Sequence, residues 1–157
     1  MLHRALVILI LLICSPALAE SGEEYFEELG CASQDDYDCV ITKLTEFAEQ
    51  GDAEAQYSLG VMYTFGEGVQ QDYAKALEWY TKAAEQGDAE AQYSVGLIYY
   101  HGYSVQQDYA KALEWFTKAA EQGLAAAQNN VGLMFNFGVG VQQDYAKALE
   151  WYTRAAE

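Results

Sequence analysis

Apolar residues recur along the chain at the spacing of helix faces, in runs that glycines interrupt at regular intervals. The pattern predicts one helix over residues 52–65, with the Asp52 side chain capping its first amides and Gly66 ending it. A second helix is predicted over residues 72–86, with Asp72 as its cap. Ala, Glu, Gln, Lys and Leu dominate both runs, and these residues do not favour strands. The chain is therefore expected to be all-α.

These two helices form a unit that recurs with a spacing of 36 residues. Residues 51–86 align with residues 87–122 and then with residues 123–157, and the run VQQDYAKALEW occurs in all three. A fixed period of this length indicates a stacked array of helix pairs, an α-solenoid. Residues 20–50 carry a fainter copy of the unit. We interpret it as a degenerate N-terminal capping repeat, because a terminal unit lacks one neighbour to pack against.

A glycine recurs inside the first helix of each unit, at Gly60, Gly96 and Gly132. Glycine in a helix interior costs about 1 kcal/mol relative to alanine. Its recurrence at one position therefore predicts a close contact between helices there.

Residues 1–19 have the pattern of a cleavable signal peptide. A short basic start precedes an apolar run over residues 5–14, which falls short of the about 20 residues that a membrane-spanning helix needs. Small residues at Ala17 and Ala19 predict cleavage after Ala19. The protein is therefore expected to be exported, periplasmic or secreted, with no stable membrane insertion after cleavage. An uncleaved membrane anchor is the alternative.

Cleavage leaves two cysteines, Cys31 and Cys39, in a compartment where disulfides persist. We expect them to be bonded, in the part of the chain whose repeat pattern is weakest and least able to bury a core. Two free thiols are the alternative.

The formal net charge is −16 at pH 7, from 24 acidic and 8 basic side chains. Such a chain is a poor partner for polyanions, so no nucleic acid is expected to bind. We interpret most of the charge as a contribution to solubility. A dedicated site for a basic partner is the alternative.

The motif A-x-A-Q-x-x-L-G-x-x-Y-x-x-G-x-G-V-x-x-D-Y-x-K-A-x-x-W-Y-x-K-A-A-x-Q-G, from Ala53 to Gly87, resembles the Sel-1-like repeat, a relative of the tetratricopeptide repeat. The resemblance covers residues 51–157 strongly and residues 23–50 weakly. It implies a right-handed superhelix of antiparallel helix pairs, whose first helices line a concave surface. It also implies a non-enzymatic scaffold or adaptor that binds other proteins or peptides.

Binding residues are sought where the near-identical units differ, because packing demands repetition and recognition demands difference. The differences gather in the first helices, where aromatic and amide side chains can stack on a peptide and hydrogen-bond to it. The alternative is that some of these rows face the interior or carry neutral variation. The predicted groove consists of Tyr57, Tyr93 and Asn129; Ser58, Ser94 and Asn130; Thr64, Tyr100 and Asn136; and His101.

Catalytic patterns are absent from the sequence. No serine has a lysine three residues further on, as a penicillin-recognising serine acylase requires. His101 is the only histidine beyond the signal peptide, so a catalytic triad or a zinc site would lack residues. We therefore predict no enzyme activity, cofactor or metal.

A cysteine-rich branch of the same family is described as β-lactamase-like and penicillin-binding, with a cysteine pair in each unit. Residues 51–157 contain no cysteine, so that branch is a poor match. The alternative function is nevertheless a small-ligand or peptidoglycan-fragment binder, β-lactam-like, with weak hydrolase activity.

The sequence stops at Glu157 without a polar closing helix. One face of the last unit is then expected to be uncovered. We expect either that the chain self-associates through that unit or that it is truncated from a longer product.

Overall fold

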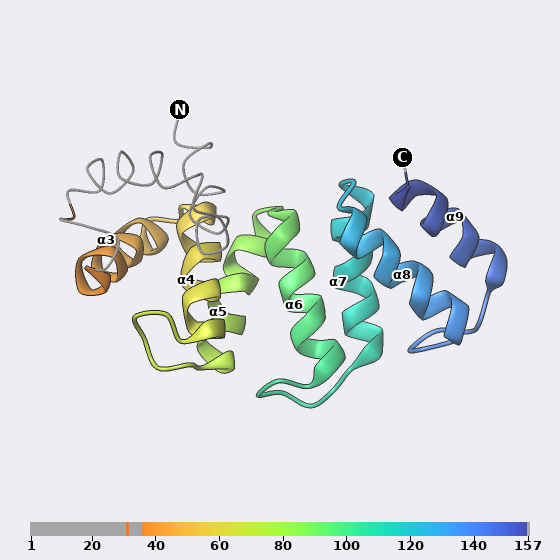
Figure 1. Cartoon of the computed structure of the whole chain (residues 1–157), viewed down its shortest axis with the longest axis horizontal. Helices are drawn as coiled ribbons and strands as arrows, with labels where there is room; N and C mark the ends of the chain where they lie inside the picture. Colours follow the sequence, from red (N-terminus) through yellow and green to blue (C-terminus); the bar gives the residue numbers. More distant parts are fainter. Residues whose placement is uncertain (1–30, 32–35, 157) are drawn as a thin grey trace.

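The computed structural model describes residue 31 and residues 36–156, and these residues contain helices and no strands. The predicted signal peptide, residues 1–19, and the start of the capping repeat lie outside the described residues. The helices follow one another in chain order along the longest axis of the molecule (Figure 1). They are α3 (Tyr37–Glu49), α4 (Ala53–Phe65), α5 (Tyr73–Glu85), α6 (Ala89–His101), α7 (Tyr109–Glu121), α8 (Ala125–Phe137) and α9 (Tyr145–Ala155).

Local capping explains where the helices begin and end. The Asp52 carboxylate accepts a hydrogen bond from the Ala55 amide at 2.8 Å, and α4 ends at Gly66, whose φ of 75° is left-handed. Asp72 caps α5 in the same way. The predicted helices of the unit are confirmed. Leu124, which stands in the N-cap position of α8, makes no side-chain capping bond.

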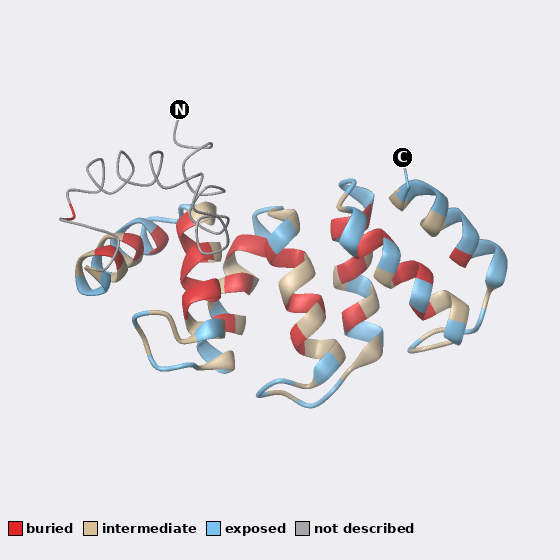
Figure 2. Cartoon of the chain, in the orientation of Figure 1, coloured by how far each residue is buried: buried red, intermediate tan, exposed pale blue. Residues whose placement is uncertain are grey.

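Each helix packs against the next one along the chain, so the described part of the molecule is an all-α solenoid of helix pairs. Buried residues lie on the facing sides of consecutive helices, whereas the turns are half-buried or exposed (Figure 2). In α9 the pattern changes, and Ala148 is its only buried residue. The core therefore runs along the array between helices, with no single centre.

The recurrent glycines lie where the two helices of a unit touch. A Cβ atom added at Gly96 would lie 2.5 Å from Cδ1 of the Phe116 ring, and one at Gly132 would lie 2.7 Å from the Tyr152 ring. The same position in α4, Gly60, faces the Tyr80 ring. The prediction of close helix contact is confirmed, because each glycine accommodates an aromatic ring of the second helix.

Buried glutamines connect three successive helices. The Gln92 amide donates to the carbonyl of Ala84 at the end of α5, at 3.1 Å. Its oxygen accepts from the Gln122 amide at the end of α7, at 2.8 Å. The equivalent bonds tie Gln56 to Ala48 and Gln86, and Gln128 to Ala120. Each amide satisfies polar groups inside the array and holds neighbouring units in register.

A disulfide joins Cys31 to Cys39, as predicted. Cys31 is buried in the cluster that α3 forms with α4, beside Val40, Leu44 and Leu59. The bond therefore fastens the chain before α3 to the first core cluster of the described residues.

Candidate partner-binding surface

The first predicted row lies on the first helices of the units and is partly used for packing. Tyr57 and Tyr93 are half-buried, and their rings lie 5.6 Å from the Tyr80 ring and 5.5 Å from the Phe116 ring, between centroids. Asn129, the third member, is exposed. Tyr57 and Tyr93 are therefore only partly accessible to a partner, whereas Asn129 is exposed.

The second row contains one residue that a partner does not reach. Ser58 is 3% exposed, and its hydroxyl donates to a carbonyl of its own helix at 2.9 Å. Ser94 makes the equivalent bond. Asn130 donates its amide to the Tyr93 hydroxyl at 3.3 Å, which links α8 to α6. The prediction that Ser58 contributes to a groove does not fit its burial.

Side chains of the third row differ between units together with the side chains that they face on the second helix. The Thr64 hydroxyl lies 3.2 Å from the Tyr80 hydroxyl, so a small side chain faces a tyrosine. In the next unit Tyr100 lies with its ring centroid 6.2 Å from that of Phe116, so a large side chain faces a phenylalanine. Packing accounts for this difference. The last unit has Asn136 and Tyr152 at these positions.

Burial keeps the phenols of this region neutral. It raises the pKa of Tyr80 to about 12, and it raises the pKa of Tyr57 further, with an added contribution from Tyr80 beside it. Burial, followed by the charge of Asp88, also raises the pKa of Glu90. A phenol of ordinary pKa is already uncharged at neutral pH, and burial extends the uncharged state of these two phenols to higher pH.

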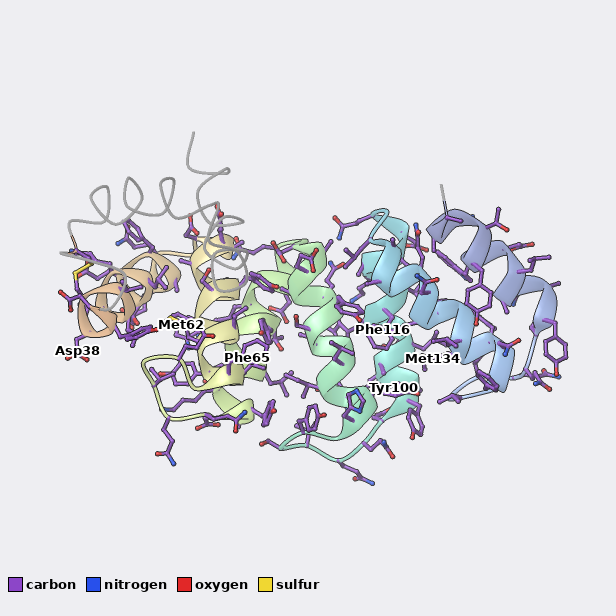
Figure 3. All side chains as sticks on the ribbon, in the orientation of Figure 1. Asp38, Met62, Phe65, Tyr100, Phe116 and Met134 are labelled. Carbon is purple, nitrogen blue, oxygen red and sulfur yellow. A yellow bond between two sulfur atoms is a disulfide. The ribbon has the colours of Figure 1, made fainter. Side chains whose placement is uncertain are left out.

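Half-buried and exposed rings gather at the end of α6 and the turn that follows it. The rings of Tyr73 and Tyr103 stack with their centroids 4.7 Å apart. The His101 ring also stacks on the Tyr103 ring, with 5.0 Å between centroids. Tyr100 meets His101 and Tyr109 edge-on, at 5.2 Å in both cases. Figure 3 shows Tyr100 at this end of α6. We call these five residues the aromatic cluster.

The sequence predicted only two members of the aromatic cluster, Tyr100 and His101. Tyr73 and Tyr109 were missed because the same tyrosine occurs in every unit and indicates packing. Tyr103 differs from its counterparts Glu67 and Val139, and that difference was the available signal.

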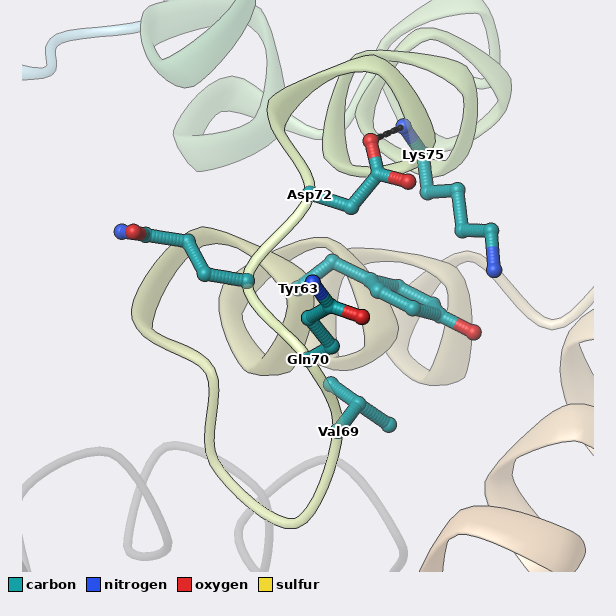
Figure 4. A pocket seen from close by; sticks show the side chains of 6 residues that line it. Tyr63, Val69, Gln70, Asp72 and Lys75 are labelled. Carbon is teal, nitrogen blue, oxygen red and sulfur yellow. Dashed lines mark hydrogen bonds between the residues drawn. The ribbon is translucent and has the colours of Figure 1, made fainter.

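A second surface feature recurs in two units. A cavity of about 350 Å³ lies between the turn and the second helix of the first unit, lined by Tyr63, Val69, Gln70, Gln71, Asp72 and Lys75 (Figure 4). The next unit has an equivalent cavity of about 350 Å³, with Tyr99 and Lys111 at the matching positions. The Lys75 amine lies 5.1 Å from the Tyr63 ring centroid, and the Lys111 amine lies 5.2 Å from that of Tyr99. The lysines thus occupy the ring faces that line these cavities.

Within residue 31 and residues 36–156, no three His, Cys, Asp or Glu side chains are placed to hold a metal ion. None of the helices described is both long enough and apolar enough to cross a membrane.

Stacked helix pairs with glycine contacts between them define a helical repeat protein of the solenoid class. The Sel1 repeat model matches residues 53–88, 89–124 and 125–157. The chain belongs to the Sel1 repeat family, whose members are generally protein-interaction scaffolds.

Two solved structures resemble the chain in sequence and fold. One is a protective antigen of uropathogenic Escherichia coli that displays the same repeat fold, 40% identical, covering 90% of this chain and 30% of that one, with a TM-score of 0.79. The other is a Sel1 repeat protein from Oxalobacter formigenes, 36% identical, covering 88% of this chain and 54% of that one, with a TM-score of 0.74. The chain thus spans about a third of the length of the first protein and about half of the length of the second.

Cysteine rich protein B of Helicobacter pylori shares the fold alone. It is 18% identical, with a TM-score of 0.61, over 80% of this chain and 90% of that one. No curated protein sequence matches the chain significantly.

Proposed function

We propose that the protein is an exported scaffold that binds a protein or peptide partner along the concave surface formed by its first helices. Asn129 carries the proposal, because it is exposed on a first helix at a position where the units differ. Tyr93 and Asn130, which are hydrogen-bonded to each other, lie in the neighbouring rows and offer a ring and an amide. The groove further includes the exposed His101 and the half-buried Tyr57, Ser94, Thr64, Tyr100 and Asn136.

Export to the periplasm or the medium is part of this proposal. A disulfide between Cys31 and Cys39 supports it, because such bonds persist in oxidising compartments. The pattern of residues 1–19 supports it independently. Amino-terminal sequencing of the chain recovered from cell fractions tests it. A processed chain that begins at Glu20 outside the cytoplasm is expected, and an unprocessed cytoplasmic chain contradicts export.

Affinity capture from native envelope extract, with the full chain as bait, tests the binding surface. The test variant combines Tyr93→Phe, which keeps the ring on Phe116, with Asn129→Ala, which removes an exposed amide. The control is Glu114→Ala, an exposed position on the second helix. A partner retained by the control and lost by the double variant supports the groove. Equal recovery by both variants contradicts it.

Self-association through the last unit stays a prediction. Leu133, Tyr145 and Leu149 are 44%, 66% and 67% exposed there, whereas their counterparts in the preceding unit are half-buried. Light scattering of the full chain measures its mass in solution, and a monomer at high concentration contradicts this prediction.

A further inference from the structure

Opposite charges flank both cavities beside the turns. Lys111 and Asp108 line the cavity of the second unit, and the Lys111 amine lies 3.7 Å from Oδ2 of Asp108. That separation exceeds the length of about 2.7–2.9 Å that is usual for a hydrogen bond between an ammonium and a carboxylate. In the first cavity, lined by Lys75 and Asp72, the Lys75 amine has no carboxylate of the described residues within 4.0 Å. Each cavity therefore holds two charges that do not close on each other.

The aspartate of each cavity is held in place because it caps the second helix. Oδ1 of Asp72 accepts hydrogen bonds from the amides of Ala74 and Lys75, at 3.0 and 3.1 Å. Oδ1 of Asp108 accepts from the Lys111 amide at 3.0 Å. Oδ2 is the second acceptor of each carboxylate, and in Asp108 it is the oxygen nearest to the Lys111 amine. A further ammonium group can therefore be accepted at Oδ2.

A phenol hydroxyl accompanies the lysine in these two cavities. The lysine amines lie 5.1 Å from the Tyr63 ring centroid and 5.2 Å from that of Tyr99. Because a lysine covers the ring face, the hydroxyl is the group that each tyrosine offers to a ligand, and Figure 4 shows the Tyr63 hydroxyl on the same side as the Lys75 amine. The third unit has Phe135 at this position, with Lys147 over its ring at 5.2 Å. That unit keeps the lysine and lacks the hydroxyl.

This arrangement of charges selects a zwitterion. A simple anion would meet the aspartate, and a simple cation would meet the lysine. An α-amino acid carries its ammonium and its carboxylate on one carbon atom, so it can place the carboxylate on the lysine and the phenol hydroxyl while its ammonium meets Oδ2. Charges of opposite sign then alternate around the contact. Exposed lysine–aspartate pairs contribute little by themselves, so the ligand displaces no strong interaction.

Size and lining narrow the ligand further. Each cavity has a volume of about 350 Å³, within the range of about 300–1,000 Å³ that small-molecule sites have. Val69 and Val105 are half-buried and give the two cavities an apolar wall. An aliphatic side chain on the amino acid can pack there.

We propose that each of these two cavities binds the main-chain zwitterion of a free aliphatic amino acid. The carboxylate of the ligand accepts from the lysine and the phenol, and its ammonium donates to the aspartate. The proposal goes beyond the scaffold function and does not depend on it, because the cavities contain none of the residues of the predicted groove.

Two-dimensional NMR of the isotope-labelled full chain, titrated with leucine, tests the proposal. The side-chain amides of Gln70 and Gln106 report on the two cavities, and that of Gln142, their counterpart in the third unit, is an internal control. Comparison probes are N-acetyl-leucine, which lacks the ammonium, and leucine amide, which lacks the carboxylate.

The test variant combines Tyr63→Phe with Tyr99→Phe. It removes the two hydroxyls and installs the side chain with which the third unit folds, Phe135. The control is Tyr145→Phe, which removes the hydroxyl of a tyrosine that is 66% exposed in the last unit. The aspartates are left unaltered because they cap helices.

Leucine is expected to move the Gln70 and Gln106 signals saturably and to move the Gln142 signal less. The affinity should fall about fivefold in the test variant, which loses one hydrogen bond in each cavity, and stay unchanged in Tyr145→Phe. Either comparison probe should bind about tenfold more weakly than leucine, because one of the two charged contacts is lost.

Equal, unsaturable shifts of all three glutamine signals overturn the proposal, and so does an affinity that the test variant leaves unchanged. Binding of N-acetyl-leucine as tightly as leucine replaces the zwitterion site with a carboxylate site. Leucine amide binding as tightly as leucine replaces it with attraction of cations to an acidic chain. These comparisons use the unaltered chain, so they decide the question even if the test variant does not fold.

The two proposals fail separately. Capture of a partner protein that Asn129→Ala with Tyr93→Phe abolishes, without saturable shifts by leucine, leaves the scaffold function standing and removes the amino-acid site. Saturable shifts without any captured protein have the opposite meaning.

Discussion

Gly96→Ala tests whether the array is held together by ring contacts on glycine. The added Cβ would lie 2.5 Å from Cδ1 and 2.6 Å from Cε1 of Phe116, distances that real carbon atoms do not adopt. Phe116 is 1% exposed, so its ring has no room to move aside. Overpacking of this kind costs about 1–3 kcal/mol, whereas alanine gains about 1 kcal/mol of helix propensity over glycine. We expect a net loss of up to about 2 kcal/mol.

Urea and thermal unfolding followed by far-ultraviolet circular dichroism measure this loss. A chain of this size loses about 2–4 °C in Tm for each kcal/mol, so the midpoint should fall by up to about 8 °C. The matched background is Phe116→Val, which removes the two ring atoms that the new Cβ meets. In that background Gly96→Ala should become neutral or stabilising by up to about 1 kcal/mol, because only the propensity gain remains.

The change of sign between the two backgrounds separates contact from propensity. If Gly96→Ala stabilised the chain by a similar amount with and without the Phe116 ring, helix propensity alone would explain it. The close approach of α6 and α7 would then be refuted.

Three further outcomes are expected. Replacing Cys31 and Cys39 by serine should lower the free energy of unfolding by about 2–3 kcal/mol, because the bond closes a short loop in the unfolded chain; an unchanged urea midpoint under oxidising conditions contradicts this. Gln92→Leu should cost about 1–3 kcal/mol in the same assay, because it removes the two hydrogen bonds that join α6 to its neighbours; a more stable variant would rule out a role for the amide. The phenol of Tyr80, whose pKa is raised from 10.0 to about 12, stays protonated in the folded chain after the unfolded chain has lost the proton. Stability should therefore fall as pH rises from about 10 to 12, by up to about 1.4 kcal/mol per pH unit for this residue, and Tyr80→Phe should flatten that profile in urea titrations at several pH values. A profile that Tyr80→Phe leaves unchanged contradicts the assignment.

The helices and their ends could be predicted because the rules that set them are local. Asp52 caps α4 and Gly66 ends it by contacts within one turn of chain, and both are legible in a single unit. The period then places the same elements in the later units. The glycine contacts were predictable for a related reason, since a costly residue recurred at one position. The period does not show how far a neighbouring helix buries each side chain. The burial of Ser58 was therefore missed.

Packing accounts for part of the variation between the units, and this explains why only part of the candidate site was predictable. Thr64 faces Tyr80, whereas Tyr100 faces Phe116, so a change in the first helix is matched by a change in the second. A difference that is compensated across a packed pair is accounted for by packing, so by itself it gives no sign of binding. Sequence comparison of the units cannot separate the two cases until the pairs are known. Uncompensated and exposed differences, of which Asn129 is an example, are the positions at which we propose recognition.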